Sequence, residues 1–271
     1  MCATCGCGET DRHGHGHGHE HGHEGAHDYG HDHPHAGPSH EHHDDGSGAT
    51  GASMLIQVEQ SLLAENDRFA AQNRAFFAGR RTRCFNLISS PGAGKTTLLE
   101  KTLSALRDRS VACAVIEGDQ ATDLDAQRIA RTGVPVFQIE TGRSCHLDAH
   151  QVQHALGRLE VPDRGLCFIE NVGNLICPTE FQLGEHERVT ILSVAEGADK
   201  PAKYPLAFST ATALVIAKID LLPHVDFDLA EAKHLIAGLN PNAPIFEVSA
   251  RTGFGMDAWL SWLQRAVDTP L

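Results

Sequence analysis

The sequence predicts an α/β fold in which a mostly parallel central sheet of about seven strands is flanked by helices. Seven short apolar runs follow one another from Arg83 to Ala250, and amphipathic segments of helix length separate most of them. Strands that are apolar throughout are typical of a parallel sheet covered on both faces. The runs are RCFNLIS, VACAVIEGD, VPVFQIET, GLCFIENV, RVTILSV, TALVIAKIDLL and PIFEVSA. Because ligands of such sheets bind beyond the carboxyl ends of the strands, we expect the site in the loops that follow these runs.

Residues 1–53 differ in composition from the rest of the chain. They hold 13 of the 19 histidines, nine acidic residues and one basic residue, and almost no aliphatic side chain. A segment of this kind buries too little apolar surface to offset its conformational entropy. We therefore expect a disordered tail over residues 1–53.

Residues 54–80 are predicted to form a helix that precedes the main domain. Apolar residues recur there at helical spacing, and Gly79 suits a C-cap. The apolar positions are Leu55, Val58, Leu62, Phe69, Phe76 and Phe77. The predicted organisation is thus a tail over 1–53, a helix over 54–80 and the main domain over 81–271.

Charge and apolar content exclude several classes of protein. The net charge is −13, and no basic stripe indicates binding to nucleic acid. No apolar run approaches the roughly 20 residues of a membrane span, and the N-terminus lacks the apolar region of a secretory signal. Cys84, Cys113 and Cys167 lie in apolar strand runs, where cysteine is typically a small buried side chain. These features favour a reducing, cytoplasmic location.

The segment SSPGAGKTT, Ser89–Thr97, has the pattern of a phosphate-binding loop between a strand and a helix. It matches G-x-x-x-x-G-K-S/T, except that Ser89 replaces the first glycine. Glycines permit a tight turn whose N–H groups point inward, while Lys95 can reach the β- and γ-phosphates and Thr96 can bind Mg²⁺. The predicted nucleotide-binding residues of this loop are Gly92, Ala93, Gly94, Lys95, Thr96 and Thr97.

Two acidic residues end strands beside this loop. Asp119 ends the second run and Glu170 ends the core of the fourth, where a carboxylate can hold Mg²⁺ directly or through water. Gly173 follows Glu170 at the spacing of the D-x-x-G switch, so its N–H is predicted to contact a γ-phosphate. The two acids are predicted to act in catalysis with Lys95, and to bind Mg²⁺ with Thr96.

The segment AKID follows the sixth strand and is similar to the N-K-x-D guanine signature, with Ala217 in place of the asparagine. Asp220 can accept hydrogen bonds from N1 and N2 of guanine, which adenine does not offer. Lys218 can lay its stem over the base. Ser249 and Ala250 end the last run, where a backbone N–H is expected to contact guanine O6. The predicted nucleotide is GTP.

Cys2, Cys5 and Cys7 form a C-x-x-C-x-C motif at the N-terminus. Three thiolates and one nitrogen suit Ni²⁺ or Zn²⁺ better than Mg²⁺. We therefore predict a metal site there, and a weaker, multi-site array in the histidines that follow.

A second set of metal ligands is predicted inside the domain. Cys145 and His146 follow the third run and Cys177 follows the fourth, so both loops are expected on the nucleotide side of the sheet. Two thiolates and one imidazole lack a fourth ligand, which a second subunit can supply. Ordinary loop cysteines are the alternative. His150 and His154 are predicted to be solvated surface residues.

Together these motifs resemble the HypB family of hydrogenase nickel-incorporation GTPases over essentially the whole chain. The resemblance lies in the C-x-x-C-G-C start, the histidine-rich tail, SSPGAGKTT, GDQATDLDAQRI, SCHLDA, ENVGNLICP, EGADKPAKYP and VSARTGFGMDAW. It implies a P-loop NTPase fold and a GTP-dependent homodimer that helps load Ni²⁺ into the large subunit of NiFe-hydrogenase. A small zinc protein, HypA, is the implied partner.

The resemblance also assigns the metal sites. It implies a high-affinity nickel site at Cys2, Cys5 and Cys7, and a metal site between subunits at Cys145, His146 and Cys177. Two other functions are weighed against this one. The first is a urease-type nickel chaperone, although its usual C-P-H motif is absent here. The second is a nickel storage or buffering protein with a vestigial nucleotide site, against which the intact Lys-Thr pair of the loop argues.

Overall fold

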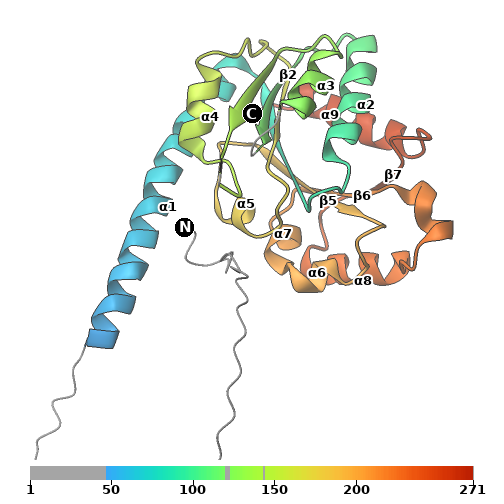
Figure 1. Ribbon diagram of the computed structural model, residues 1–271. Helices are drawn as coiled ribbons and strands as arrows, with labels where there is room; N and C mark the ends of the chain where they lie inside the picture. The colour runs from blue at the N-terminus through green and yellow to red at the C-terminus, as the bar shows by residue number, and fades with distance from the viewer. Residues whose placement is uncertain (1–46, 120–122, 143, 271) are drawn as a thin grey trace, which may run out of the picture. The chain divides into compact units, whose positions relative to one another are not determined.

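The computed structural model describes residues 47–119, 123–142 and 144–270 (Figure 1). Contacts divide the chain into two units, Met1–Gln57 and Val58–Leu271. The predicted tail ligands Cys2, Cys5 and Cys7 lie outside the described residues. Within the described ranges, no helix is both long enough and apolar enough to cross a membrane.

Helix α1, Ser47–Arg80, begins seven residues before the start predicted at Met54. The stretch ahead of Met54, SGATGAS, contains no proline to stop the helix, although its two glycines are poor helix formers. The apolar pattern does not indicate this extension toward the N-terminus. Near the other end of α1, Phe77 is fully buried, so this part of the helix packs on the domain.

The seven strands form one sheet in the order β3-β2-β4-β1-β5-β6-β7, and each described pair of neighbours is parallel. The strands are β1 Arg83–Ser89, β2 Cys113–Asp119, β3 Val136–Glu140, β4 Leu166–Glu170, β5 Glu187–Ser193, β6 Ala213–Ala217 and β7 Ile245–Val248. The predicted α/β fold class is confirmed, as is the burial of Cys84, Cys113 and Cys167.

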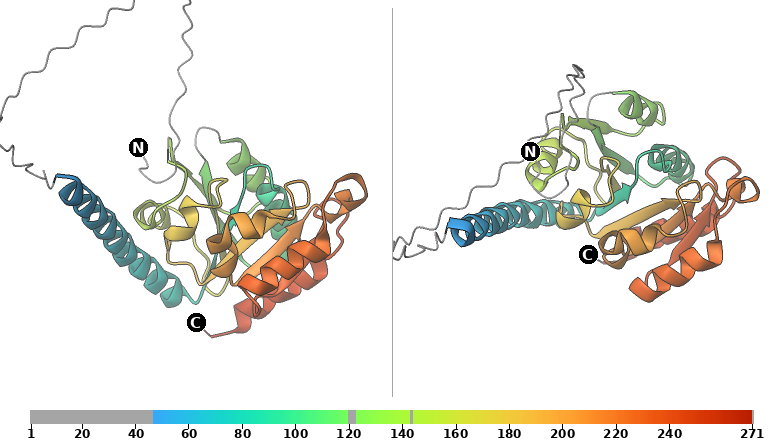
Figure 2. Two further views of the ribbon diagram at one scale, coloured as in Figure 1. Left: turned by 90° about the horizontal axis from the view of Figure 1, so that it is seen from below. Right: turned by 60° about the horizontal axis from the view of Figure 1, so that its bottom comes forward.

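Helices cover both faces of the sheet (Figures 1 and 2). Apolar side chains of α2, α3 and α9 pack on one face, and those of α1, α4, α7 and α8 pack on the other. The helices after α1 are α2 Lys95–Asp108, α3 Leu124–Ala130, α4 Ala149–Leu156, α5 Cys177–Glu180, α6 Lys200–Lys203, α7 Pro205–Ser209, α8 Leu229–Leu239 and α9 Met256–Asp268. Side chains alternate along β1, so Phe85 faces the first layer and Cys84 faces the second.

The strand in the sixth run is shorter than the apolar pattern of residues 212–222. Strand β6 ends at Ala217 because Lys218 adopts φ of 60°, which a strand does not accommodate. A 3₁₀ helix, η1, follows over Ile219–His224. The turn at Lys218 directs the chain toward the phosphate loop, as the contacts below show.

The strand order places the phosphate loop at the middle of the sheet. Strand β1 lies between β4 and β5, and the loop continues directly from its carboxyl end. The carboxyl end of β4, with Glu170, is the neighbouring strand end. In an α/β sheet this edge is where ligands bind.

Candidate nucleotide site and metal cluster

The phosphate loop turns between the end of β1 and the start of α2, as the sequence predicts. Gly92 has φ of 73° and Gly94 has φ of 101°, both in the left-handed region that favours glycine. A Cβ on Gly94 would lie 3.3 Å from Cε of Lys218, so this glycine also makes room for the base-recognition loop. The backbone N–H groups at the start of α2 are available to an anion at this turn.

Lys95 is buried at the first position of α2, with 8% of its surface exposed. Its Nζ donates to Oγ of Ser89, 3.0 Å away. Burial lowers the pKa of the ammonium, and the charge of Glu170 opposes that effect. The serine that replaces the first glycine of the motif therefore holds the lysine across the turn.

Glu170 lies behind the loop and contacts Thr96. The Thr96 hydroxyl donates to Oε1 of Glu170 at 2.7 Å, while Oε2 is buried and has no hydrogen-bond partner among the described residues. Burial raises the pKa of this carboxyl to about 7, although the Lys95 charge lowers it. A buried carboxylate with an open oxygen beside a threonine hydroxyl fits a hard divalent cation such as Mg²⁺.

Two further acids near Glu170 were missed from the sequence. Carboxylate oxygens of Glu117, Asp125 and Glu170 all lie within 4.8 Å of one another. Glu117 faces Glu170 in the register between β2 and β4, and a charged residue inside an apolar strand run was the available signal. The backbone of Asp119 ends β2 as predicted, but its side chain lies outside what the structure describes.

Arg128 on α3 links Asp125, near the start of the same helix, to helix α2. Its Nη1 lies 3.0 Å from Oδ1 of Asp125, and its Nη2 donates to Glu100 at 2.5 Å and to Oγ1 of Thr97 at 3.1 Å. Thr97 is the last residue of the phosphate-loop motif. The Arg128 guanidinium therefore links Asp125, and with it the acidic cluster of Glu117, Asp125 and Glu170, to Thr97 in the first turn of α2.

The base-recognition residues converge on the same turn. Lys218 donates from Nζ to the carbonyl oxygen of Gly92 at 2.7 Å. Asp220 accepts from Oγ of Ser249 at 2.6 Å and pairs with Nε of Arg251 at 3.2 Å. The Ser249 hydroxyl, followed by Arg251, holds the pKa of the Asp220 carboxyl below its usual range. Asp220 is thus an ionised acceptor beside the predicted Ser-Ala loop.

The predicted switch glycine also lies at the phosphate loop. A Cβ on Gly173 would stand 2.9 Å from Cα of Pro91, so only a glycine permits this approach. Between Glu170 and this glycine, Asn171 accepts the N–H of Leu147 on Oδ1 at 3.2 Å. The chain that follows β4 therefore touches both the phosphate loop and the segment after β3.

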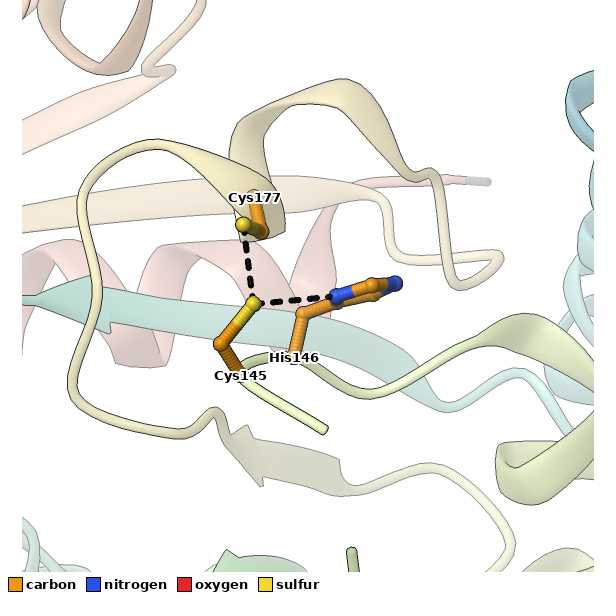
Figure 3. Close-up of side chains that lie close together, drawn as sticks. All are labelled: Cys145, His146 and Cys177. Carbon is orange, nitrogen blue, oxygen red and sulfur yellow. Dashed lines mark hydrogen bonds between the residues drawn. The ribbon is translucent and has the colours of Figure 1, made fainter. Parts of the chain in front are cut away.

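The structure brings Cys145, His146 and Cys177 together (Figure 3). The two Sγ atoms are 2.9 Å apart, and Sγ of Cys145 is 3.8 Å from Nδ1 of His146. The His146 ring stacks on Phe181, with centroids 4.2 Å apart. Burial lowers the pKa of the imidazole, which favours the neutral form that binds metals. Two sulfur donors and one nitrogen suit Ni²⁺ or Zn²⁺.

A buried ion pair anchors the segment that follows Cys177. Arg188 on β5 pairs with Glu185 at 2.9 Å, and both residues are buried. The same guanidinium donates to the carbonyl oxygens of Thr179 at 2.8 Å and Phe181 at 3.2 Å.

His150 and His154 on α4 are exposed, as predicted, and the His150 ring lies 4.8 Å from that of Phe69.

Comparison with known proteins identifies the family. The nucleotide-binding domain described as CobW/HypB/UreG matches residues 84–247. The chain is 52% identical to the hydrogenase maturation factor HypB of Azotobacter vinelandii, over 81% of this chain and 72% of that protein. It is 50% identical to HypB of Escherichia coli K12, over 82% and 77% respectively.

Two solved structures have the same fold. The crystal structure of HypB from Helicobacter pylori in complex with nickel is 37% identical, with a TM-score of 0.70 over 75% of this chain and 95% of that one. HypB from Archaeoglobus fulgidus is 38% identical, with a TM-score of 0.71 over 76% and 100%. The chain therefore belongs to the CobW/HypB/UreG family of P-loop nucleotide-binding proteins, and within it to the HypB hydrogenase maturation factors.

Proposed function

We propose that this protein is a GTP-hydrolysing nickel chaperone, which captures Ni²⁺ and assists its insertion into the large subunit of NiFe-hydrogenase. The observation that carries the proposal is the pairing of two sites in one domain. The first site is the phosphate loop at the end of β1, where the Thr96 hydroxyl lies beside the Glu170 carboxyl. The second is the cluster of sulfur and nitrogen donors from Cys145, His146 and Cys177. Relatives that are 52% and 50% identical over 81% and 82% of this chain are named hydrogenase maturation factors.

In the proposed reaction, the loop residues Gly92–Thr97 and the N–H of Gly173 bind the phosphates of GTP. Lys95 supplies a charge to the β- and γ-phosphates, and Asp220 selects guanine with Lys218, Ser249 and Ala250 around the base. Thr96, Asp119 and Glu170 would hold Mg²⁺, which when bound neutralises charge on the β- and γ-phosphate oxygens. Lys95, Asp119 and Glu170 are the proposed catalytic residues.

Two sets of side chains are proposed to bind the transported Ni²⁺. Cys2, Cys5 and Cys7 are proposed to capture Ni²⁺, and Cys145, His146 and Cys177 to bind Ni²⁺ or Zn²⁺ with a ligand from the second subunit of a homodimer. The H. pylori relative has been solved with nickel, which supports a nickel role for this fold. The proposed partners are a HypA-like zinc protein and the hydrogenase large-subunit precursor.

Delivery of nickel to urease is the second candidate. A relative from Helicobacter hepaticus, 40% identical over 72% of this chain and 81% of its own length, is named a hydrogenase/urease maturation factor. That name favours a second recipient for proteins of this type. Comparing nickel transfer to the hydrogenase large-subunit precursor with transfer to apo-urease distinguishes the two candidate functions.

The test is nickel transfer from the full-length protein, loaded with radioactive ⁶³Ni²⁺, to a purified hydrogenase large-subunit precursor. We expect transfer with GTP and Mg²⁺, and little transfer with a non-hydrolysable analogue or with Cys177→Ser. Transfer to apo-urease alone would favour the second candidate. Equal transfer without any nucleotide would identify a nickel-buffering protein and contradict the proposal.

A further inference from the structure

Helix α1 contacts both of the segments that carry the metal-cluster ligands. One segment runs from Cys145 to the start of α4 at Ala149, and the other runs from Cys177 through Glu185. Two asparagines of α1, Asn66 and Asn73, each hydrogen-bond to both segments. They stand seven residues apart, which is about two turns of an α-helix, so they share one face.

Asn73 spans the segments with a single amide nitrogen. Its Nδ2 donates to the carbonyl oxygen of Ala149 at 2.8 Å and to that of Leu183 at 2.9 Å. The residue is 1% exposed, so water does not compete for these bonds. The acceptors lie three residues after His146 and six residues after Cys177.

Asn66 spans the same segments with both ends of its amide. Its Oδ1 accepts the N–H of Ala149 at 2.9 Å, and its Nδ2 donates to the carbonyl oxygen of Gln182 at 2.8 Å. Its exposed fraction is 6%. Each segment thus receives two hydrogen bonds from this pair of asparagines, and both asparagines are buried.

Gly184 lets the second segment lie directly against the helix. Its φ is 94°, and a Cβ there would stand 2.6 Å from the carbonyl oxygen of Ala70 and 2.6 Å from Cβ of Asn73. Arg74 adds a bond from Nη2 to the carbonyl oxygen of Glu185 at 3.1 Å. The backbone approach and the amide bonds therefore fix the separation of the two segments at one place.

We propose that Asn66 and Asn73 are positioning residues of the metal cluster, and that they clamp the two segments at the spacing where the donors of Cys145, His146 and Cys177 meet. This inference rests on the proposed function, because it requires the cluster to bind nickel. In the described part of the chain, neither asparagine hydrogen-bonds to Cys145, His146 or Cys177. Each acts through the backbone of Ala149, Gln182 or Leu183, so losing it should widen the cluster and weaken metal binding rather than remove a ligand.

The test uses full-length protein with Cys2, Cys5 and Cys7 replaced by serine, so that tail thiolates do not contribute. The readout is the thiolate-to-nickel absorption band, titrated against a competing chelator, because histidines of the tail do not produce it. Buried Cys84 and Cys113 do not interfere, since burial raises the pKa of both thiols, that of Cys113 to about 12.

The variants are graded by the bonds they remove. Asn73→Ala and Asn66→Ala each lose two bonds, whereas Asn66→Asp keeps the acceptor for Ala149, loses the donor to Gln182 and sets a buried carboxylate against that carbonyl oxygen. Gln72→Ala is the matched control, because this exposed residue of α1 bonds only to Gln153 of α4 among the described contacts. Substitutions around a metal site typically weaken binding about 10–100-fold, and we expect this for both alanine variants.

The expected pattern is a weaker and shifted band for the alanine variants, an effect at least as large for Asn66→Asp, and no change for Gln72→Ala, while GTP affinity stays within about twofold of the parent. Unchanged nickel affinity in folded alanine variants would overturn the clamp and leave the nickel site standing. Equal loss of GTP affinity and nickel affinity would also overturn it, since that marks a general loss of structure. If the parent has no band, the cluster itself is disproved and the clamp falls with it.

Discussion

The nucleotide site and the metal cluster are built in different ways. The phosphate loop lies within nine consecutive residues between β1 and α2, and its geometry depends on two glycines with positive φ. The cluster takes its ligands from two segments, and Cys145 and Cys177 are 32 residues apart. The contacts that hold these segments come from α1 and β5. A local motif is thus sufficient for the phosphate loop, whereas the metal cluster depends on the tertiary structure around it. The following experiments separate the two.

Replacing Lys95 should have the largest effect and should be confined to the nucleotide site. Lys95→Ala removes the ammonium group that bonds to Ser89 across the phosphate loop and that is proposed to contact the phosphates. We expect GTP hydrolysis to fall by about 100- to 1,000-fold or more. Phosphate release and the thiolate-to-nickel band should be measured in one preparation. Loss of both activities would show that the two sites are not independent.

Asp220→Asn tests base recognition. A carboxylate that accepts two N–H bonds becomes an amide with one acceptor, so a guanine donor loses its partner. Stranding a donor in this way should weaken GTP binding by about tenfold or more. ATP affinity, measured in parallel, should not change. A parent protein that binds ATP and GTP equally would contradict the guanine assignment. This comparison matters because Ala217 stands where the guanine signature has an asparagine.

The two sites meet after β4, where Gly173 approaches Pro91 and Asn171 accepts the N–H of Leu147. If Gly173 senses the γ-phosphate, Cys177 should move relative to Cys145 on hydrolysis. By reciprocity, nickel affinity of the cluster should differ between GTP-analogue and GDP states by about 5–150-fold. The serine-substituted tail and thiolate absorption supply the measurement. Equal affinity in both states would assign the cluster a structural role.

A smaller effect concerns His186, which directly follows the segment that ends at Glu185. His186 accepts the N–H of Cys84 on Nδ1 at 3.0 Å, and burial, followed by the charge of Arg83, lowers the pKa of its ring to about 4. The neutral ring is thus preferred in the folded state. Stability from this residue is complete above about pH 6.5, the ordinary histidine pKa, and is lost as the pH falls toward 4.

Because the His186 ring is only partly buried, solvent screening should limit this contribution to about 1 kcal/mol. His186→Asn keeps an acceptor near the Nδ1 position and does not titrate. Denaturant unfolding of both proteins at pH 7 and pH 4.5 provides the comparison. The parent should lose about 1 kcal/mol more than the variant between these two pH values, and equal losses would contradict the assignment.

The fold and much of the nucleotide site could be predicted from the sequence because their signals are local. Apolar runs mark the strands, and the spacing of Gly94, Lys95 and Thr96 follows from the turn. The meeting of Cys145 and Cys177 was also predicted, since both follow strands that end on one side of the sheet. The tail site at Cys2, Cys5 and Cys7 stays a prediction.

The remaining features were not predictable for physical reasons. Glu117 and Asp125 approach Glu170 only through strand register and the docking of α3. Asn66 and Asn73 read as ordinary polar positions of an amphipathic helix, and their partners lie 76 to 116 residues away. Nothing in the spacing along α1 indicates which loop carbonyls it will reach.

The long reach of α1 has a consequence for the order in which the molecule is made. Asn66 cannot form its hydrogen bond to Gln182 until a further 116 residues have been translated. At about 5–20 residues per second, their synthesis takes roughly 6–23 s. The cysteines of the tail are translated well before Cys145 and Cys177, and the internal cluster requires most of the sheet to be translated. A newly made chain therefore passes through a period in which the tail ligands are present and the internal cluster is not. Metal encountered during that period meets the tail before the second site exists.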